Sequence, residues 1–204
     1  SKILPKKDIT KHEACKLFNL PEDVWLTGIL GRFSPKKGQD FVIECFHELI
    51  KKDDSIHLVL AGEPTSGREG IEYYDQIQSL ISKYHLDNHV SFPGFIRETS
   101  AFFKAIDCFI MSSMRETYGM VTVEALVSGV QIIGTNTGGT PELLGYGKYG
   151  YLYTPGDKQE FISAIDDIRK NPIPVEKYQK GLHQKFSHTA QCENMELLFS
   201  RLCS

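Results

Sequence analysis

Short apolar runs alternate with longer amphipathic stretches along the whole chain. In the longer stretches apolar positions recur every three or four residues, which predicts helices, and the short runs between them predict strands. Because these runs are apolar on both faces, helices are expected to cover both sides of the sheet. The alternation predicts the α/β class, with a doubly wound parallel sheet of about six strands. The strands are expected at residues 24–30, 56–61, 90–92, 108–111, 130–134 and 150–153.

The helix at residues 71–84 is expected to turn Tyr74, Ile77, Ile81 and Tyr84 inward. A polar loop at residues 63–70 is expected before it, and Pro93 and Gly94 are expected to form a turn after the third strand. The other helices are expected at residues 10–18, 39–51, 100–106, 119–128, 158–169, 174–184 and 187–202, with a short one beginning at Thr140.

Composition narrows the class of protein. The 204 residues carry a net charge of −3 at pH 7 without a basic stripe, which argues against nucleic acid as a partner. The five cysteines are widely spaced and form no C-x-x-C pair, which fits reduced thiols in a cytoplasmic protein. No apolar run is long enough to cross a membrane. Nothing divides the chain, so residues 1–204 are expected to form one domain.

Ligands of a doubly wound sheet bind outside the carboxyl ends of its strands. The loop at residues 31–38 places Arg32 and Lys37 there, and a guanidinium and an ammonium are common partners of phosphate oxygens. Gly31 and Gly38 allow a backbone to approach closely. The same loop also fits an ordinary solvated surface turn, so by itself it does not establish a phosphate site.

The loop at residues 112–119 carries the most informative pattern. Gly119 lies between a strand and a helix, so free N–H groups at the helix start can bind an anion such as a phosphate. Glu116 precedes this helix, and Glu124 lies within it among apolar residues, where a carboxylate needs a partner or a ligand. A locally paired Glu116 with a solvated Glu124, a glycosidase pair or a metal site are the alternatives, but the cationic first loop favours phosphate.

Two further loops allow two interpretations each. Gly138 and Gly139 fit a second anion site or a tight turn, and the turn is favoured. Phe95 and Ile96 fit an apolar wall for a flat base, although core packing is the favoured explanation for Phe95. The chain lacks the dinucleotide fingerprint, the P-loop, the G-x-S-x-G elbow and the H-E-x-x-H motif.

Four blocks follow one another along the chain: GRFSPKKGQD at residues 31–40, LVLAG at 58–62, ETYGMVTVEA at 116–125 and GGTPE at 138–142. In this order they resemble the C-terminal, donor-binding half of retaining GT-B glycosyltransferases, which has a Rossmann-like fold, and in particular the bacterial "group 1" family. The resemblance runs from about residue 8 to residue 203.

The resemblance implies a role for each matching position. Arg32 and Lys37 would bind the diphosphate of a nucleotide sugar and, with Glu116 at the sugar hydroxyls, would be the catalytic residues. Glu124 would accept hydrogen bonds from the ribose. No metal or other cofactor is expected, and UDP is favoured over GDP or ADP. The remaining donor-binding positions would be Gly31, Gly62, Phe95, Ile96, Gly119, Met120 and Val121.

One departure from the family concerns length, because its members are usually about twice as long. The expectation is therefore an excised domain that binds the nucleotide sugar but transfers sugar poorly or not at all alone. Its glycan or lipid-linked acceptor would be held by an absent N-terminal domain. The full-length protein would be cytoplasmic, with the inner face of the membrane as an alternative site of action. Three competing hypotheses remain: a sugar-nucleotide epimerase half, a phosphorylase half and a non-catalytic nucleotide-sugar-binding module.

Overall fold

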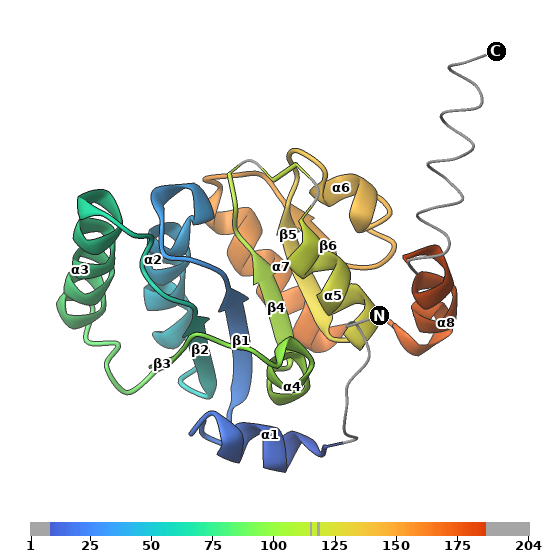
Figure 1. Ribbon diagram of the computed structural model, residues 1–204, viewed down its shortest axis with the longest axis horizontal. Helices are drawn as coiled ribbons and strands as arrows, with labels where there is room; N and C mark the ends of the chain where they lie inside the picture. Colours follow the sequence, from blue (N-terminus) through green and yellow to red (C-terminus); the bar gives the residue numbers. More distant parts are fainter. Residues whose placement is uncertain (1–8, 115, 118, 187–204) are drawn as a thin grey trace.

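Six parallel strands form the centre of the molecule (Figure 1). The computed structural model describes residues 9–114, 116–117 and 119–186. Within these residues the sheet has the order β3-β2-β1-β4-β5-β6, so the chain starts in the middle, winds to one edge and returns to the other side of β1. The predicted doubly wound α/β fold is confirmed. The strands are β1 (Trp25–Leu30), β2 (Ile56–Ala61), β3 (Val90–Gly94), β4 (Cys108–Met111), β5 (Gln131–Thr135) and β6 (Tyr151–Tyr153).

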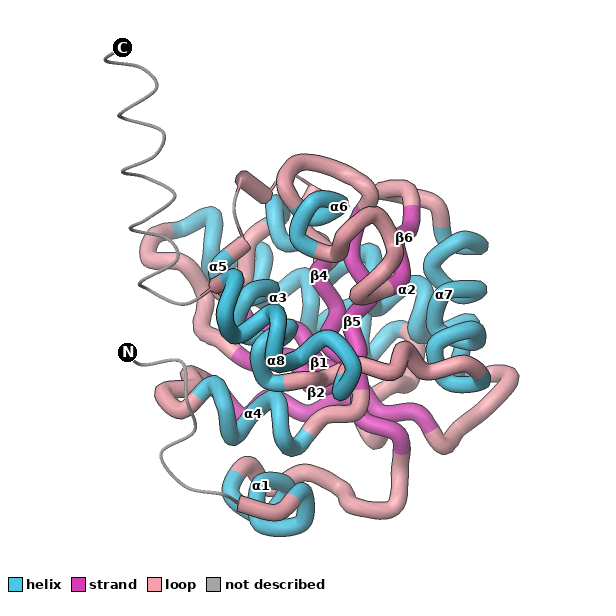
Figure 2. Tube along the Cα trace, turned by 90° about the vertical axis from the view of Figure 1, so that its right-hand side faces the viewer, coloured by secondary structure: helices cyan, strands magenta, loops and turns pink. Residues whose placement is uncertain are grey.

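Helices cover both faces of the sheet, as Figure 2 shows from the side. Helices α2, α3 and α7 pack on one face, and α1, α4, α5 and α8 pack on the other. Alternate residues along each strand point to the two layers, which is why the strands are apolar on both faces. The helices are α1 (Lys11–Leu17), η1 (Pro35–Lys37), α2 (Gln39–Ile50), α3 (Arg68–Lys83), α4 (Thr99–Ala105), α5 (Met120–Ser128), α6 (Thr140–Leu143), α7 (Lys158–Lys170) and α8 (Glu176–Lys185).

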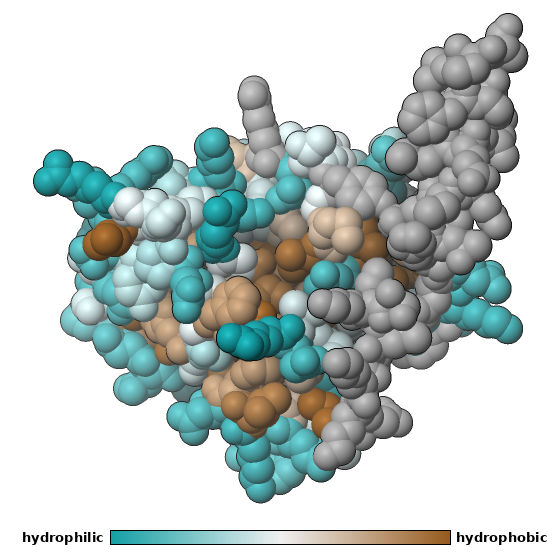
Figure 3. Space-filling view, in the orientation of Figure 1, coloured by the Kyte–Doolittle hydropathy of each residue, from teal (hydrophilic) through white to brown (hydrophobic). Residues whose placement is uncertain are grey.

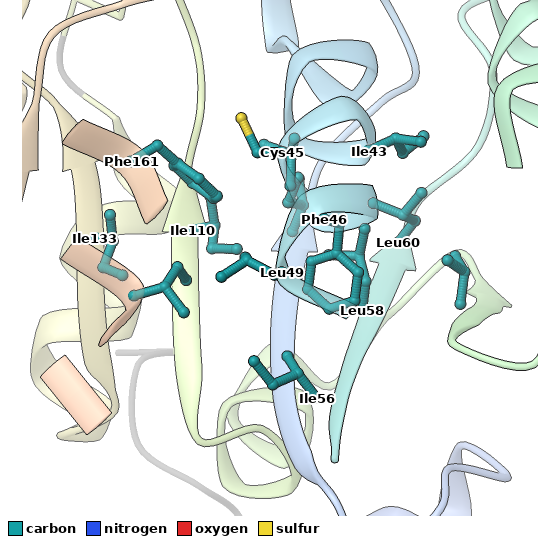
Figure 4. Packing of buried hydrophobic residues seen from close by; sticks show 14 of the residues in the cluster. Ile43, Cys45, Phe46, Leu49, Ile56, Leu58, Leu60, Ile110, Ile133 and Phe161 are labelled. Carbon is teal, nitrogen blue, oxygen red and sulfur yellow. The ribbon is translucent and has the colours of Figure 1, made fainter. Parts of the chain in front are cut away.

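The larger core cluster lies between the sheet and α2, α3 and α7. Figure 4 shows Phe46 and Leu49 of α2 directed toward the strands, where they meet residues such as Leu58 and Ile110. Phe46 is fully buried, as is Cys45 beside it on the same helix. Burial raises the pKa of the Cys45 thiol to about 12, so this thiol stays protonated and unreactive. The helix expected at residues 39–51 is confirmed as α2.

The opposite face is the one seen in Figure 3. Polar side chains lie along its upper left and lower edges, and apolar ones gather in its middle. Beneath this surface, Phe102 of α4 and Phe109 of β4 are buried in the second core cluster. A few large apolar side chains of this layer stay outside, such as Leu17 on α1. Single exposed apolar residues of this kind are common on folded proteins.

Two boundaries and the inward face of one helix differ from the sequence prediction. Strand β3 continues through Pro93 to Gly94, because β3 is an edge strand and proline is tolerated there. Helix α3 begins at Arg68, inside the predicted loop. Tyr73 of α3 is buried, and its hydroxyl donates to the Asp40 carboxylate on α2 (2.9 Å), whereas the predicted inward residues Tyr74 and Tyr84 are only partly buried. The helix expected at residues 187–202 lies outside the described residues.

His57 on β2 is a buried titratable group. It is 6% exposed and hydrogen-bonded to the Ser91 hydroxyl (2.8 Å), and burial together with the charge of His89 lowers its pKa from 6.5 to about 4. At a pH between 6.5 and 4, the His57 ring therefore binds a proton in the unfolded chain but not in the folded chain. We expect the free energy of unfolding to fall by up to about 3 kcal/mol as the pH drops from 6.5 to 4. Urea unfolding between pH 7.5 and 4.5 measures this.

The matched variants for this measurement are His57→Gln and His85→Gln. The first keeps a polar side chain without an ionisable ring, so we expect a flatter pH dependence. The second removes an exposed histidine and is expected to leave the dependence unchanged. An equal slope in all three proteins would show that His57 does not couple folding to pH.

Candidate functional site

The candidate residues gather where the strand order reverses. Strands β1 and β4 are neighbours, and their following helices α2 and α5 lie on opposite faces of the sheet. The loops after these two strands therefore lie side by side at the upper end of the sheet in Figure 1. In open α/β sheets this reversal forms a natural crevice for ligands.

Lys37 and Glu116 meet across these two loops. The Lys37 ammonium donates to Oε2 of Glu116 at 2.8 Å, although 79 positions separate the two residues. Their side chains are 31% and 22% exposed, so both keep access to a ligand. The partner of Glu116 is therefore distant in the sequence, unlike the local pairing that the sequence left open as an alternative. The pair joins the cationic loop to the acidic loop in a single constellation.

The glycine-rich loop after β5 supports Glu116 from behind. The Gly139 N–H donates to the Glu116 carbonyl oxygen at 2.9 Å. Gly138 has a φ of +58°, and a Cβ there would collide with the same carbonyl oxygen. The favoured interpretation of this loop as a tight turn is confirmed. Its contribution to the site, which the sequence did not reveal, is to hold the backbone of Glu116.

Helix α5 presents its amino end beside this constellation. Gly119 caps it with a φ of +60°, and no acceptor among the described residues takes the N–H groups of Gly119, Met120 or Val121. Free N–H groups and the helix dipole together favour an anion at such an end. The Thr122 hydroxyl is also buried there without a partner in the described part of the chain.

Glu124 lies one turn into the same helix. Its Oε2 atom is buried, and no described residue offers it a hydrogen bond. A buried carboxylate oxygen without a partner is costly unless a ligand or water satisfies it. The sequence predicts that this side chain needs a partner, and the described residues do not provide one for this oxygen.

The remaining candidates lie around this centre. Arg32 is exposed, and its side chain forms no hydrogen bond or ion pair with the described residues. Gly31 lies beside the aliphatic part of Lys37. Gly62, at the end of β2, packs on the Gly31 carbonyl. Phe95 is 64% exposed while Ile96 is 6% exposed, so the core packing favoured for Phe95 is wrong. The physical reason is Gly94, whose φ of +75° redirects the chain at the end of β3.

The described residues lack the features of two other kinds of site. No three His, Cys, Asp or Glu side chains come together there in a way that could hold a metal ion. No helix in that part of the chain is long and apolar enough to span a bilayer.

Comparison with known proteins identifies the family. The family model described as "Glycosyl transferases group 1" matches residues 11–185. The chain belongs to this family. The matched range contains every candidate site residue, and the group 1 resemblance drawn from the sequence is confirmed.

The relatives of this group 1 chain include transferases of several kinds. Mannosylfructose-phosphate synthase from Agrobacterium fabrum is 27% identical over 164 residues, which cover 78% of this chain and 36% of that protein. Anabaena HepE, crystallised with UDP and glucose, is 26% identical with a TM-score of 0.82, over 94% of this chain and 53% of HepE. The C-terminal domain of LpcC, a group 1 family protein from Francisella tularensis, shares the fold at 22% identity and a TM-score of 0.76, over 91% and 97% of the two chains.

The group 1 chain covers only part of mannosylfructose-phosphate synthase and of HepE. It spans between 36% and 53% of the length of the curated relatives that it matches.

Proposed function

We propose that this chain is the donor-binding domain of a retaining glycosyltransferase. It would take a sugar from a nucleotide diphosphate sugar, with UDP favoured over GDP or ADP, and pass it to a polysaccharide or glycolipid acceptor. The observation that carries the proposal is the Lys37–Glu116 contact beside the amino end of α5, whose first N–H groups have no acceptor among the described residues. A cation, a carboxylate and unpaired N–H groups at one strand-order reversal suit a diphosphate with a hydroxyl-bearing group beside it.

Each side chain has a distinct task in the proposed site. Lys37, Arg32 and the N–H groups at the start of α5 bind the diphosphate oxygens. Glu116 accepts hydrogen bonds from the sugar hydroxyls, and Glu124 accepts them from the ribose. The unsatisfied Oε2 atom of Glu124 supports this last assignment, because a ribose hydroxyl supplies the missing donor.

The chemistry follows from where charge develops. When the bond between the anomeric carbon and the diphosphate breaks, negative charge grows on the departing phosphate oxygen. Fixed donors stabilise that charge most when they are in place before the reaction. In the proposed mechanism Lys37, Arg32 and the helix end supply these donors, and no metal takes part. Retention of configuration is carried over from the family resemblance.

The likeness to HepE supports UDP as the nucleotide, since HepE is described in complex with UDP and with UDP-glucose. The exposed ring of Phe95 supports a base-binding role at the end of β3. In this proposal the acceptor is held by residues beyond this chain. The chain alone is therefore expected to bind the donor and to transfer sugar poorly or not at all.

Calorimetry with UDP, GDP, ADP and their sugars tests the proposal. We expect UDP and UDP-sugars to bind, and Glu124→Gln to weaken uridine and UDP alike by ~10-fold, because both contain the ribose. Glu69→Gln, which removes an exposed carboxylate on α3, is the control and should bind like the unchanged chain. An effect of Glu124→Gln on sugar-containing ligands alone would refute the ribose assignment, and binding of no nucleoside diphosphate would refute the function.

A further inference from the structure

Ser112 connects the two loops of the proposed site from below. It is the first residue after β4 and is 3% exposed. Its hydroxyl donates to the carbonyl oxygen of Lys37 at 2.6 Å. Water has little access to a site this buried, so no solvent molecule readily replaces this hydrogen bond.

Two other contacts hold the same segment in register. The Met114 N–H donates to the Lys36 carbonyl oxygen at 3.2 Å. Gly38 has a φ of +67°, and a Cβ there would lie 2.6 Å from the Ser112 carbonyl oxygen, so the two backbones are in close contact. The end of β4 thus fixes the backbone on both sides of Lys37.

The position of the Lys37 ammonium depends on this backbone. A lysine side chain has four rotatable bonds, and its charged end is placed reproducibly only when its backbone and its partner are both fixed. Glu116 lies four residues after Ser112, and its Oε2 atom accepts a hydrogen bond from the Lys37 ammonium at 2.8 Å. Ser112 therefore stands at the point where the lysine loop and the glutamate loop are joined.

We propose that Ser112 is a positioning residue of the donor site: its hydroxyl places Lys37 so that the ammonium meets both Glu116 and the donor diphosphate. The part that concerns the diphosphate rests on the proposed function. The part that concerns Glu116 does not, since that contact exists in the chain without a ligand.

The first test measures ligand binding. Ser112→Ala is expected to weaken UDP by ~10-fold and to leave uridine unchanged, because only UDP contacts the Lys37 ammonium. Calorimetry measures UDP, and an NMR shift titration measures the weaker uridine. In a Lys37→Ala background, Ser112→Ala should add no further loss. Thr27→Val is the matched control, because it removes another buried hydroxyl-to-carbonyl bond, from Thr27 to His57 (3.2 Å), inside the sheet.

A merely structural role for Ser112 gives a different pattern. It would weaken uridine and UDP equally, or its effect would add fully to that of Lys37→Ala, and either result overturns the proposal. If Lys37→Ala weakens UDP but Ser112→Ala does not, the positioning role is wrong while the diphosphate site stands. Ser112→Cys, with similar volume and a weaker donor, replaces the alanine variant if that variant does not fold.

The second test needs no ligand and decides the part that concerns Glu116 even if the chain binds no nucleotide. A double-mutant cycle of Lys37→Met and Glu116→Gln, followed by urea unfolding, measures how strongly the two side chains are coupled. We expect this coupling to fall to within error of zero when Ser112 is replaced by alanine, and to persist in the Thr27→Val chain. Coupling that survives in the Ser112→Ala chain would overturn the proposal.

Discussion

Replacing Lys37 by alanine is expected to weaken UDP binding by ~10–100-fold, about the loss of one charged hydrogen bond. Two physical effects act in the same direction. The diphosphate loses a cation, and Glu116 is left as an unpaired, half-buried carboxylate beside it. Calorimetry with UDP on the folded variant measures the effect. Adding Glu116→Gln to Lys37→Ala removes the repelling charge, so part of the UDP affinity should return.

Variants of the neighbouring cations Lys36 and Arg32 are the comparisons for Lys37→Ala. Lys36→Ala removes the same charge from an exposed position one residue away and is expected to change UDP affinity by less than about twofold. Arg32→Ala is expected to weaken UDP as much as Lys37→Ala, without affecting stability, because its exposed side chain forms no hydrogen bond or ion pair with the described residues. Unchanged affinity in both the Lys37 and the Arg32 variants would rule out the phosphate assignment.

Gly138→Ala is expected to lower both stability and donor binding. A side chain at this φ of +58° is strained, and its Cβ would collide with the Glu116 carbonyl oxygen. The backbone strain and the collision together are expected to cost roughly 2–5 kcal/mol in the free energy of unfolding. Because relief of the collision must move Glu116, UDP-sugar affinity should fall in the same variant. Urea unfolding and calorimetry measure the two effects.

Gly156→Ala measures the cost of backbone strain at a positive φ without the collision that occurs at Gly138. Gly156 has a φ of +84°, and nothing lies within 4 Å of a Cβ built there. We expect it to lose only the strain part, about 1–2 kcal/mol, and to bind UDP-sugar normally. If the two variants lose the same stability and bind alike, the contact between the β5 loop and Glu116 does not support the site.

The fold was predictable because its signals are local. Apolar runs and amphipathic periods depend on neighbouring residues, so they located every strand and α-helix of the described chain, although not the short helix η1. The errors occurred where tertiary context overrides local preference. Pro93 is compatible with a strand only because β3 is at the sheet edge. Tyr73 is buried because its hydroxyl donates a hydrogen bond to Asp40 on another helix.

The candidate site was predictable only in part. Sequence order placed Lys37 and Glu116 at the ends of two strands, but their contact depends on β1 and β4 being neighbours across 79 residues. The roles of Ser112 and Gly138 were not predictable, because both act through backbone atoms of distant residues. No residue type or spacing in the sequence signals such a contact. The resemblance to the group 1 family supplied what the pattern could not, namely an assignment of each position to a part of the donor.

The loop with Phe95 differs from the others in how it is attached. Among the described residues, no side-chain hydrogen bond links positions 93–98 to the loops of Lys37 and Glu116, whereas those two loops are joined at several points. In the proposed site, the part that faces the base can therefore accumulate substitutions while the part that holds the diphosphate stays intact. Because the two parts are separate, substitutions in evolution or in protein engineering can change which nucleotide is accepted and leave the residues that hold the departing diphosphate unchanged.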